Sequence, residues 1–169
     1  IKQICGQVFR YAIATGRAHR DPSQDLTGAL PPYQKKNFPT ITDPKRIAQL
    51  LQAINGYQGH TATICALRLA PVVFARPGEL RHAEWTEIDF ESCEWRIPAN
   101  KMKMKRVHII PLSTQAIGLL REIEPLTGRG QFVFPSITST KRPISDNTLT
   151  AAIRRLGFDK SEFVVHGFR

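Results

Sequence analysis

The chain has 169 residues, and 24 lysines and arginines against 14 aspartates and glutamates give it a net charge of +10. This length accommodates one well-packed domain and a short piece of another. No apolar run is long enough to span a bilayer, and the opening residues lack the layout of a signal peptide, so we expect a cytoplasmic protein with no membrane partner. Basic residues recur along the whole chain, which favours a polyanionic partner, most simply nucleic acid. The alternative is a basic protein without such a partner.

The three cysteines, Cys5, Cys65 and Cys93, are widely spaced and odd in number. They form no CxxC pair and no Cys/His cluster, so neither a disulfide framework nor a zinc site is indicated. We expect three reduced structural thiols, as in a cytoplasmic protein.

The opening segment places apolar residues at helical spacing and predicts a helix that ends near Gly16. From residue 21 to residue 41 the chain is rich in Pro, Gly, Gln and Lys, which is typical of a linker. We therefore expect a domain boundary there, with residues 1–20 as the last helix of a preceding domain. The chain begins with Ile1, so we expect its N-terminus to be a cut or processed end.

Residues 42–169 are expected to form the main domain. Thr42 or Asp43 can cap a helix with Pro44 in its first turn. The apolar stretch TATICALRLAPVVFA predicts a buried helix that Pro71 kinks or ends. The segments TEIDFESCEWRIP and RVHIIPL predict short strands, joined by the basic turn NKMKMK. Further helices are expected from Ser113 through Leu120 and over residues 145–156. The predicted fold class is mainly α with a small three-stranded antiparallel sheet.

Three motifs could carry chemistry, and the first is FARPGELRHAEW. Pro77 suits the first turn of a helix, so Arg76 is expected at or just before a helix N-terminus. The free N–H groups there favour an anion, and a guanidinium adds a planar, bidentate phosphate donor. Glu79, three residues on, could reach back to brace Arg76. The alternative is an ordinary capped helix with a surface ion pair.

The second motif is KMKMKR, which places four basic residues at a predicted hairpin turn: Lys101, Lys103, Lys105 and Arg106. If strand geometry extends that far, alternation puts the three lysines on one side and the methionines on the other. A lysine on this turn could enter a DNA groove or donate a proton. The alternative is a solvated edge that resists aggregation.

The third motif is HGFR, in which His166 and Arg169 would share one face of a helix. We expect both side chains to be partly exposed or disordered. Arg154 and Arg155 lie off the apolar stripe of the preceding helix, where they are solvated or contact a phosphate.

In order and spacing, the motifs RPGELRHAEW, MKMKRVHIIPLS and HGFR resemble the tyrosine recombinase (phage integrase) family, and within it the integrases of prophages and genomic islands. The resemblance covers essentially the whole chain. It implies that residues 1–20 are the last helix of a core-binding domain and residues 42–169 most of a catalytic domain. Phe74-Ala75 depart from the Thr-Gly that many relatives carry before the arginine, so we expect a local backbone difference there.

The resemblance also implies roles. A tyrosine hydroxyl would attack a DNA phosphodiester and form a 3′-phosphotyrosyl link, with no metal or other cofactor. Arg76 and Arg169 would hold the non-bridging oxygens, and Glu79 would support Arg76. Lys103 would protonate the departing 5′-oxygen, and Lys101 and Lys105 are near enough in the sequence to take this role if the match slips by one turn. His166 would assist proton transfer or bind the phosphate. Lys101, Lys105, Arg106, Arg154 and Arg155 are further candidates for contact with DNA.

The nucleophile is missing from these residues, because Tyr11, Tyr33 and Tyr57 all precede Arg76. In the family, the tyrosine lies well beyond the His–x–x–Arg motif. We therefore expect a fragment of a longer recombinase or a truncated gene product, inactive in cleavage alone. The expected partner is double-stranded DNA at attachment sites, and the parent protein is expected to act as a homotetramer on it. The alternative is a non-enzymatic, basic DNA-binding module. An RNA-binding protein lacks support, since the nine phenylalanines form no RNP-like pattern.

Overall fold

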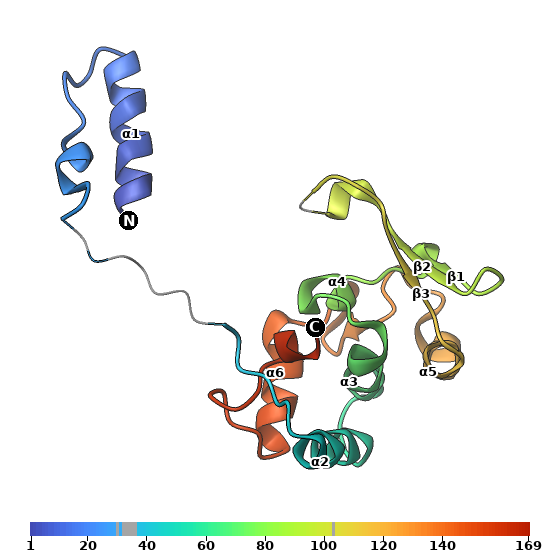
Figure 1. The fold of residues 1–169 in the computed structure, drawn as a ribbon. Helices are drawn as coiled ribbons and strands as arrows, with labels where there is room; N and C mark the ends of the chain where they lie inside the picture. Colours follow the sequence, from blue (N-terminus) through green and yellow to red (C-terminus); the bar gives the residue numbers. More distant parts are fainter. Residues whose placement is uncertain (30, 32–36, 103) are drawn as a thin grey trace. The chain divides into compact units, whose positions relative to one another are not determined.

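The structure is a computed structural model that describes residues 1–29, 31, 37–102 and 104–169 (Figure 1). It divides into two compact units, Ile1–Asn37 and Phe38–Arg169. Lys103, the predicted proton donor, lies outside the described residues.

The first unit consists of helix α1 (Lys2–Ala14) and the 3-10 helix η1 (Pro22–Leu26), which packs against it. The predicted end of α1 is confirmed, because Gly16 has a φ of +68° and turns the chain away. Residues 22–26 differ from the expected linker. Asp21 caps η1 by accepting a hydrogen bond from the Ser23 N–H at 2.9 Å, and both residues are buried.

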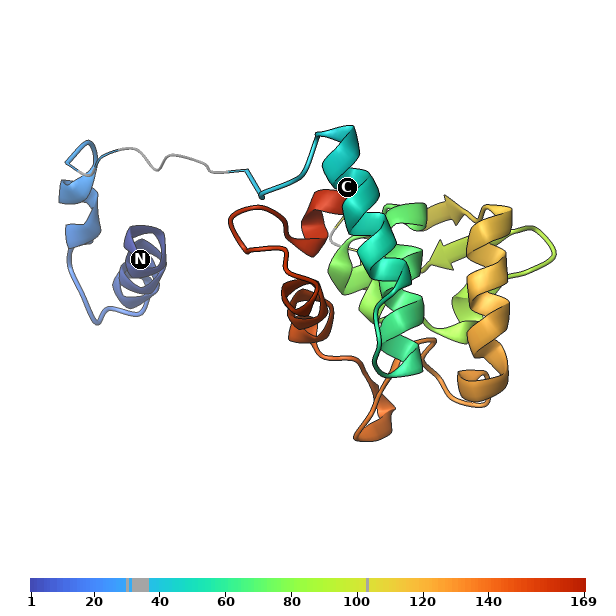
Figure 2. The same cartoon turned by 90° about the horizontal axis from the view of Figure 1, so that it is seen from below.

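Among its described residues, the second unit has five α-helices: α2 (Pro44–Asn55), α3 (Thr61–Val73), α4 (Pro77–Arg81), α5 (Thr114–Thr127) and α6 (Asp146–Arg155). Helix α3 lies in the middle and packs against the other four, as its almost wholly apolar sequence predicts (Figures 1 and 2). Pro71 lies in its last turn, and Phe74 ends it in the left-handed conformation with a φ of 52°. Asp43 caps α2 through the Arg46 N–H at 3.0 Å, which confirms that predicted start.

Three short antiparallel strands form the predicted sheet in the order β1–β2–β3: β1 (Ile88–Asp89), β2 (Glu94–Ile97) and β3 (His108–Pro111). Trp95 in β2 pairs with Ile88 on one side and Ile110 on the other. Trp95, Ile97 and Ile110 are buried, so one face of the sheet belongs to the core. The 3-10 helix η2 (Trp85–Glu87) precedes β1. The predicted fold class is therefore confirmed.

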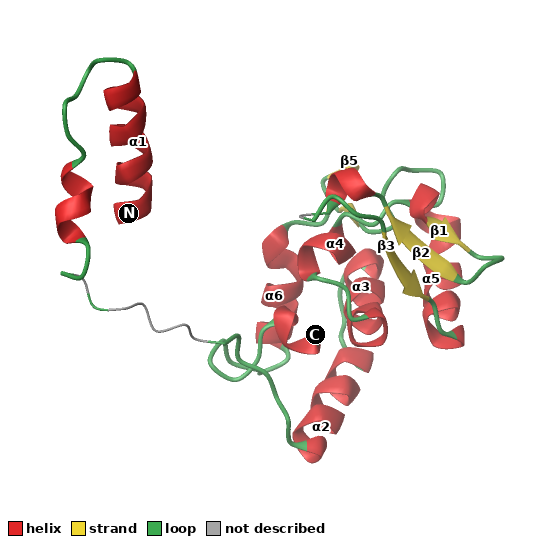
Figure 3. Cartoon of the chain, turned by 45° about the horizontal axis from the view of Figure 1, so that its top comes forward, coloured by secondary structure: helices red, strands yellow, loops and turns green. Residues whose placement is uncertain are grey.

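Two elements differ from the sequence-based expectation. A second antiparallel pair, β4 (Pro135–Ser136) and β5 (Ser139–Pro143), was not predicted, because its residues are mostly polar and show no apolar alternation (Figure 3). Helix α5 was expected to end at Leu120 but continues to Thr127. Ile123 is fully buried in this added turn, so core packing extends the helix through Pro125.

The basic turn between β2 and β3 also departs from the prediction. The strand ends at Ile97, and Ala99–Lys101 form the 3-10 helix η3. Lys105 has a φ of 50°, which is left-handed backbone. The condition for the predicted alternation, strand geometry that extends to the lysines, is therefore not met at Lys101 or at Lys105.

The chain closes with the 3-10 helix η4 (Val165–Phe168), which contacts α3 and α6 (Figure 1). In a 3-10 helix, residues three apart lie almost directly above one another, so the expected shared face of His166 and Arg169 is consistent with this geometry. Both residues are exposed. Within the described ranges, no helix has the length and apolarity needed to cross a membrane.

Candidate active site

The first part of the site is the N-terminus of α4. Arg76 is the N-cap residue and Pro77 the first helical residue, as predicted. Glu79 turns back and accepts the Arg76 backbone N–H on Oε2 at 2.9 Å and the Arg76 Nη1 on Oε1 at 2.5 Å. The expected brace is therefore present. It fixes the backbone and the guanidinium of Arg76 with a single carboxylate.

Arg169 adds a second guanidinium to the same carboxylate, with its Nη1 at 3.8 Å from Glu79 Oε2. The Glu79 side chain is only 10% exposed, whereas those of Arg76 and Arg169 are 48% and 40% exposed. Burial by itself would raise the pKa of Glu79. The hydrogen bonds from Arg76 and the charges of both arginines outweigh burial and hold that pKa below its ordinary value. Two cations thus share one ionised carboxylate, and the surplus positive charge faces outward.

His166 lies beside this group. Together with Arg76 and Glu79 it lines a cavity of about 670 Å³. Its ring stacks on Phe38, with the ring centroids 4.4 Å apart and the planes at 8°. The motifs RPGE and HGFR, far apart in sequence, therefore meet around one cavity.

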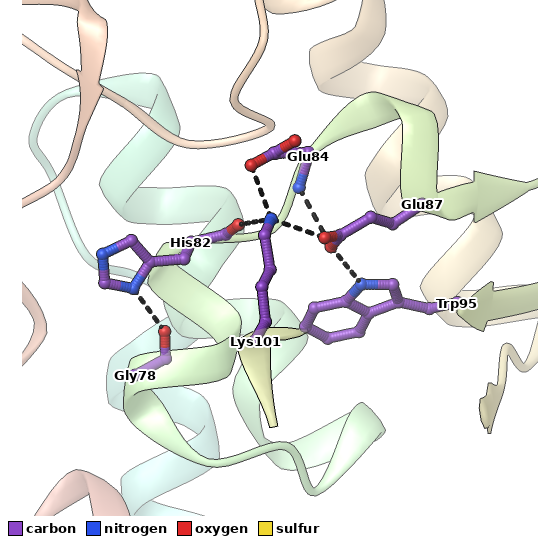
Figure 4. A network of polar contacts seen from close by, with 6 residues as sticks. All are labelled: Gly78, His82, Glu84, Glu87, Trp95 and Lys101. Atoms are coloured by element: carbon purple, nitrogen blue, oxygen red, sulfur yellow. Dashed lines mark hydrogen bonds and ion pairs between the residues drawn. The ribbon is translucent and has the colours of Figure 1, made fainter. Parts of the chain in front are cut away.

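Lys101 lines the same cavity from the hairpin side. Its Nζ donates to Glu84 Oε1 and Glu87 Oε1, both at 2.5 Å, and to the His82 carbonyl oxygen at 3.3 Å (Figure 4). Burial would lower the pKa of Lys101, but the two carboxylates outweigh it and raise that pKa above its ordinary value. Here one cation shares two carboxylates, the reverse of the arginine group.

Four other predicted residues lie apart from this cavity. Arg154 donates to the carbonyl oxygens of Phe158 and Phe163, the latter at 2.7 Å, so its guanidinium is used within the fold. Arg155 donates to the Tyr57 hydroxyl at 3.4 Å and is otherwise exposed. Lys105 and Arg106 are exposed on the hairpin. Their contacts with DNA stay predictions.

Four residues of the site were not singled out in the sequence. His82, Glu84 and Glu87 line the cavity, and Phe38 covers one face of His166. Glu84 and Glu87 follow closely after RPGE, but their partner Lys101 is 17 and 14 residues away, so no local spacing indicates the pair. Among the described residues, no group of three or more His, Cys, Asp and Glu side chains is arranged to hold a metal ion.

The arrangement suits a phosphate on the arginine side. Guanidinium groups bind phosphate oxygens in a bidentate manner, and a carboxylate behind them keeps their planes fixed. The imidazole of His166 at the same cavity can form a hydrogen bond with a phosphate oxygen. These are the groups that a phosphoryl transfer needs when side chains alone stabilise the charge of the transition state.

Comparison with known proteins matches residues 40–169 to the phage integrase family and residues 1–29 to the phage integrase central domain. The prophage integrase IntA of Escherichia coli (strain K12) is 36% identical over 172 residues, which cover 100% of this chain and 41% of that protein. The integrase of Enterobacteria phage P4 is 34% identical over 182 residues, covering 100% of this chain and 41% of that protein.

Among solved structures, a lambda integrase tetramer bound to a Holliday junction superimposes with a TM-score of 0.65 at 19% identity. It covers 99% of this chain and 50% of that one, and it shows that the fold is shared. The chain spans less than half the length of the curated relatives named above. The match of a family model to residues 40–169, together with this fold, shows that the chain belongs to the phage integrase family.

Proposed function

We propose that the protein containing this chain is a site-specific DNA recombinase that cuts and rejoins DNA through a 3′-phosphotyrosyl intermediate. Residues 42–169 would supply most of its catalytic domain, and residues 1–20 the last helix of a core-binding domain. Its partner would be double-stranded DNA at attachment sites, bound by a homotetramer. Relatives named as integrases support the activity, and the lambda integrase tetramer on a Holliday junction supports the partner and the assembly.

The chemistry is a transesterification with balanced bonds. A tyrosine oxygen attacks the scissile phosphorus and loses its proton, a P–O(tyrosine) bond forms, and the bond from phosphorus to the 5′-oxygen breaks. The 5′-oxygen takes up a proton and leaves as a hydroxyl. The reverse reaction, with a 5′-hydroxyl of another strand, rejoins the DNA. The number of phosphoester bonds does not change, so no external energy source enters the step.

Each residue of the site would have one task. Arg76 and Arg169 hold the non-bridging oxygens, and Glu79 orients the Arg76 guanidinium by a hydrogen bond and attracts that of Arg169 by its charge. His166 assists proton transfer at the phosphate, and Lys103 protonates the departing 5′-oxygen. The tyrosine is not among residues 77–169 of this chain, so these 169 residues alone are expected not to cleave DNA.

One observation carries the proposal: two arginines from different elements, far apart in the sequence, share the carboxylate of Glu79 beside His166. A surface ion pair of a capped helix would not require a second arginine. A site for the non-bridging oxygens of a phosphodiester requires both.

The test begins by reading the coding DNA past the codon for Arg169 and producing the full-length protein. A suicide duplex that traps the covalent protein–DNA complex then measures cleavage. We expect Arg76→Ala and Arg169→Ala each to slow cleavage about a hundred- to a thousandfold. DNA binding should weaken modestly, with the salt dependence reduced by about one log–log unit per lost phosphate contact.

A non-enzymatic DNA-binding module of the same fold predicts another result. It would form no covalent complex at any attachment site, and both variants would only weaken salt-dependent binding. A covalent complex formed by residues 1–169 alone would contradict the assignment of the nucleophile to a residue outside them.

A further inference from the structure

The Lys101 ammonium makes more hydrogen bonds than a simple surface ion pair would give it. A lysine ammonium has three N–H donors, and all three have an acceptor here: Glu84 Oε1, Glu87 Oε1 and the His82 carbonyl oxygen (Figure 4). The side chain is 28% exposed, so water screens these contacts only in part. A side chain with every donor engaged is fixed in place.

The acceptors are themselves anchored in the core. Glu87 is buried, and its Oε2 accepts the Trp95 Nε1 at 3.0 Å and the Glu84 backbone N–H at 3.3 Å (Figure 4). Trp95 is among the largest fully buried side chains and lies on the central strand β2. The contacts of Lys101 therefore connect the start of the hairpin to the middle of the sheet.

The position of Lys101 in the chain shows which segment these contacts fix. It is the last residue of η3, just after β2 leaves the sheet, and it stands two residues before Lys103. It also shares a cavity with Arg76, Glu79 and His166. A contact that fixes Lys101 thus fixes where the hairpin leaves the sheet relative to the arginine group.

The charges argue against Lys101 as the proton donor of the reaction. Carboxylates that hold an ammonium group favour its charged form, and the pKa of Lys101 is raised accordingly. A proton donor at neutral pH needs the opposite tuning. Moreover, one ammonium beside two carboxylates leaves a negative local charge, which does not attract a phosphate.

The charges of Glu84 and Glu87 also predict the effect of removing the Lys101 ammonium. Glu84 and Glu87 would face each other and the cavity with no cation between them, and the repulsion would act on η2 and on the hairpin. It would also act on a phosphate held by Arg76. Lys101 therefore reduces the negative charge on one wall of a cavity that, in the proposed function, accepts a phosphate.

We propose that Lys101, held by Glu84 and Glu87, is a positioning residue that anchors the β2–β3 hairpin and reduces the negative charge of the acidic wall of the active-site cavity, and is not the general acid. This inference rests on the proposed recombinase function. It assigns the anchoring role to Lys101 and leaves proton donation to another lysine of the hairpin.

The experiment compares Lys101→Met with Lys101→Arg in the full-length protein. Arginine can bridge two carboxylates but cannot give up a proton, and the adjoining cavity leaves room for its longer side chain. Cleavage is measured on a suicide duplex and on the same duplex with sulfur in place of the 5′ bridging oxygen at the scissile phosphate. A departing thiolate needs no proton, so this substrate restores cleavage only where a general acid is missing.

We expect Lys101→Met to slow cleavage about ten- to a hundredfold on both duplexes, because a misplaced hairpin impairs either reaction. Lys101→Arg should stay within a few-fold of the unmodified protein. Lys141→Met, a change of an exposed lysine on β5, serves as the control and should have no effect. If the sulfur duplex rescues Lys101→Met, or if Lys101→Arg is as slow as Lys101→Met, the proposal is overturned.

Amide hydrogen exchange in the DNA-free protein separates this proposal from the proposed function. The amides of residues 99–107 should exchange faster in Lys101→Met and at the normal rate in Lys101→Arg. Unchanged exchange in Lys101→Met would refute the anchor even in an active recombinase. Absence of cleavage by the unmodified protein would refute the recombinase function, whereas the exchange result would still decide on the anchor.

Discussion

The two sides of the candidate active-site cavity have opposite ratios of charge. On the arginine side, Arg76 and Arg169 share the single carboxylate of Glu79. On the hairpin side, Lys101 alone is bound by the two carboxylates of Glu84 and Glu87. A surplus of cations provides a place for an anion, whereas a surplus of carboxylates immobilises a cation. One side is therefore suited to bind a phosphate and the other to hold the fold in place.

The means of support differ as well. The hairpin side is held by ion pairs that end on the buried Trp95. The HGFR segment is held by neutral and backbone contacts with residues 38–40. The Thr40 hydroxyl donates to the Gly167 carbonyl oxygen at 2.9 Å, and the Val164 N–H donates to the Pro39 carbonyl oxygen at 3.3 Å. A Cβ on Gly167 would come within 3.0 Å of that same Pro39 oxygen, so glycine lets the two segments meet.

The largest expected effect concerns the shared carboxylate. Glu79→Gln should slow cleavage by the full-length protein about a hundredfold, because both guanidinium groups lose the charge that orients them. The matched change Glu84→Gln should cost less than tenfold, since Lys101 keeps its contact with Glu87. The suicide duplex measures both. Equal losses of cleavage rate in the two variants would contradict the assignment of phosphate binding to the arginine side alone.

Next in size is the support that Arg154 gives to the loop between α6 and η4. Arg154→Met leaves the buried residues Phe158 and Phe163 with carbonyl groups that lack this donor, and we expect a loss of about 2 kcal/mol in the free energy of unfolding. Arg155→Met, one residue on, should change stability by less than about 0.5 kcal/mol because Arg155 is exposed. Urea unfolding followed by circular dichroism distinguishes the two. Similar values for both variants would contradict a specific anchoring role.

A fall in pH should weaken the contacts of Glu79 on the arginine side, and a rise in pH should weaken those of Lys101 on the hairpin side. The pKa of Glu79 is lowered in the folded protein, so its stabilisation is present above the ordinary carboxyl pKa and is lost as the pH falls through the folded value. The pKa of Lys101 is raised, so its stabilisation is present below the ordinary lysine pKa and is lost as the pH rises through the folded value. Glu79→Gln should flatten the acid limb of a stability–pH curve, and Lys101→Met the alkaline limb. An acid limb unchanged in Glu79→Gln would rule out this linkage.

The smallest expected effect is that of the stacked ring. Phe38→Leu should cost roughly 0.5–1 kcal/mol, the size of a single aromatic pair, while Phe38→Tyr should cost little. The His166 ring protons provide the specific readout, because a stacked phenyl ring shifts their NMR signals upfield. That shift should disappear in Phe38→Leu and persist in Phe38→Tyr. Identical His166 spectra in all three proteins would mean that the stack is not formed in solution.

Local chemistry explains what could be predicted from the sequence. The caps at Asp43 and Ser113 and the contact between Arg76 and Glu79 join residues three apart, so spacing alone indicates them. Apolar runs located α3 and the three-stranded sheet. The β4–β5 pair was not predicted because most of its residues are polar. The end of α5 was predicted too early because the helix is extended by the packing of Ile123 in the core, which local sequence does not indicate.

The amino-acid sequence by itself determined the family, the fold class and the RPGE and HGFR motifs, because motif spacing and hydrophobic periodicity are properties of the chain. Only the tertiary structure decided how the charges are divided. It placed Arg169 beside Glu79 and Lys101 between Glu84 and Glu87. The physical reason is that an ion pair depends on distance in space and on burial, and neither follows from the order of residues when the partners stand on different elements.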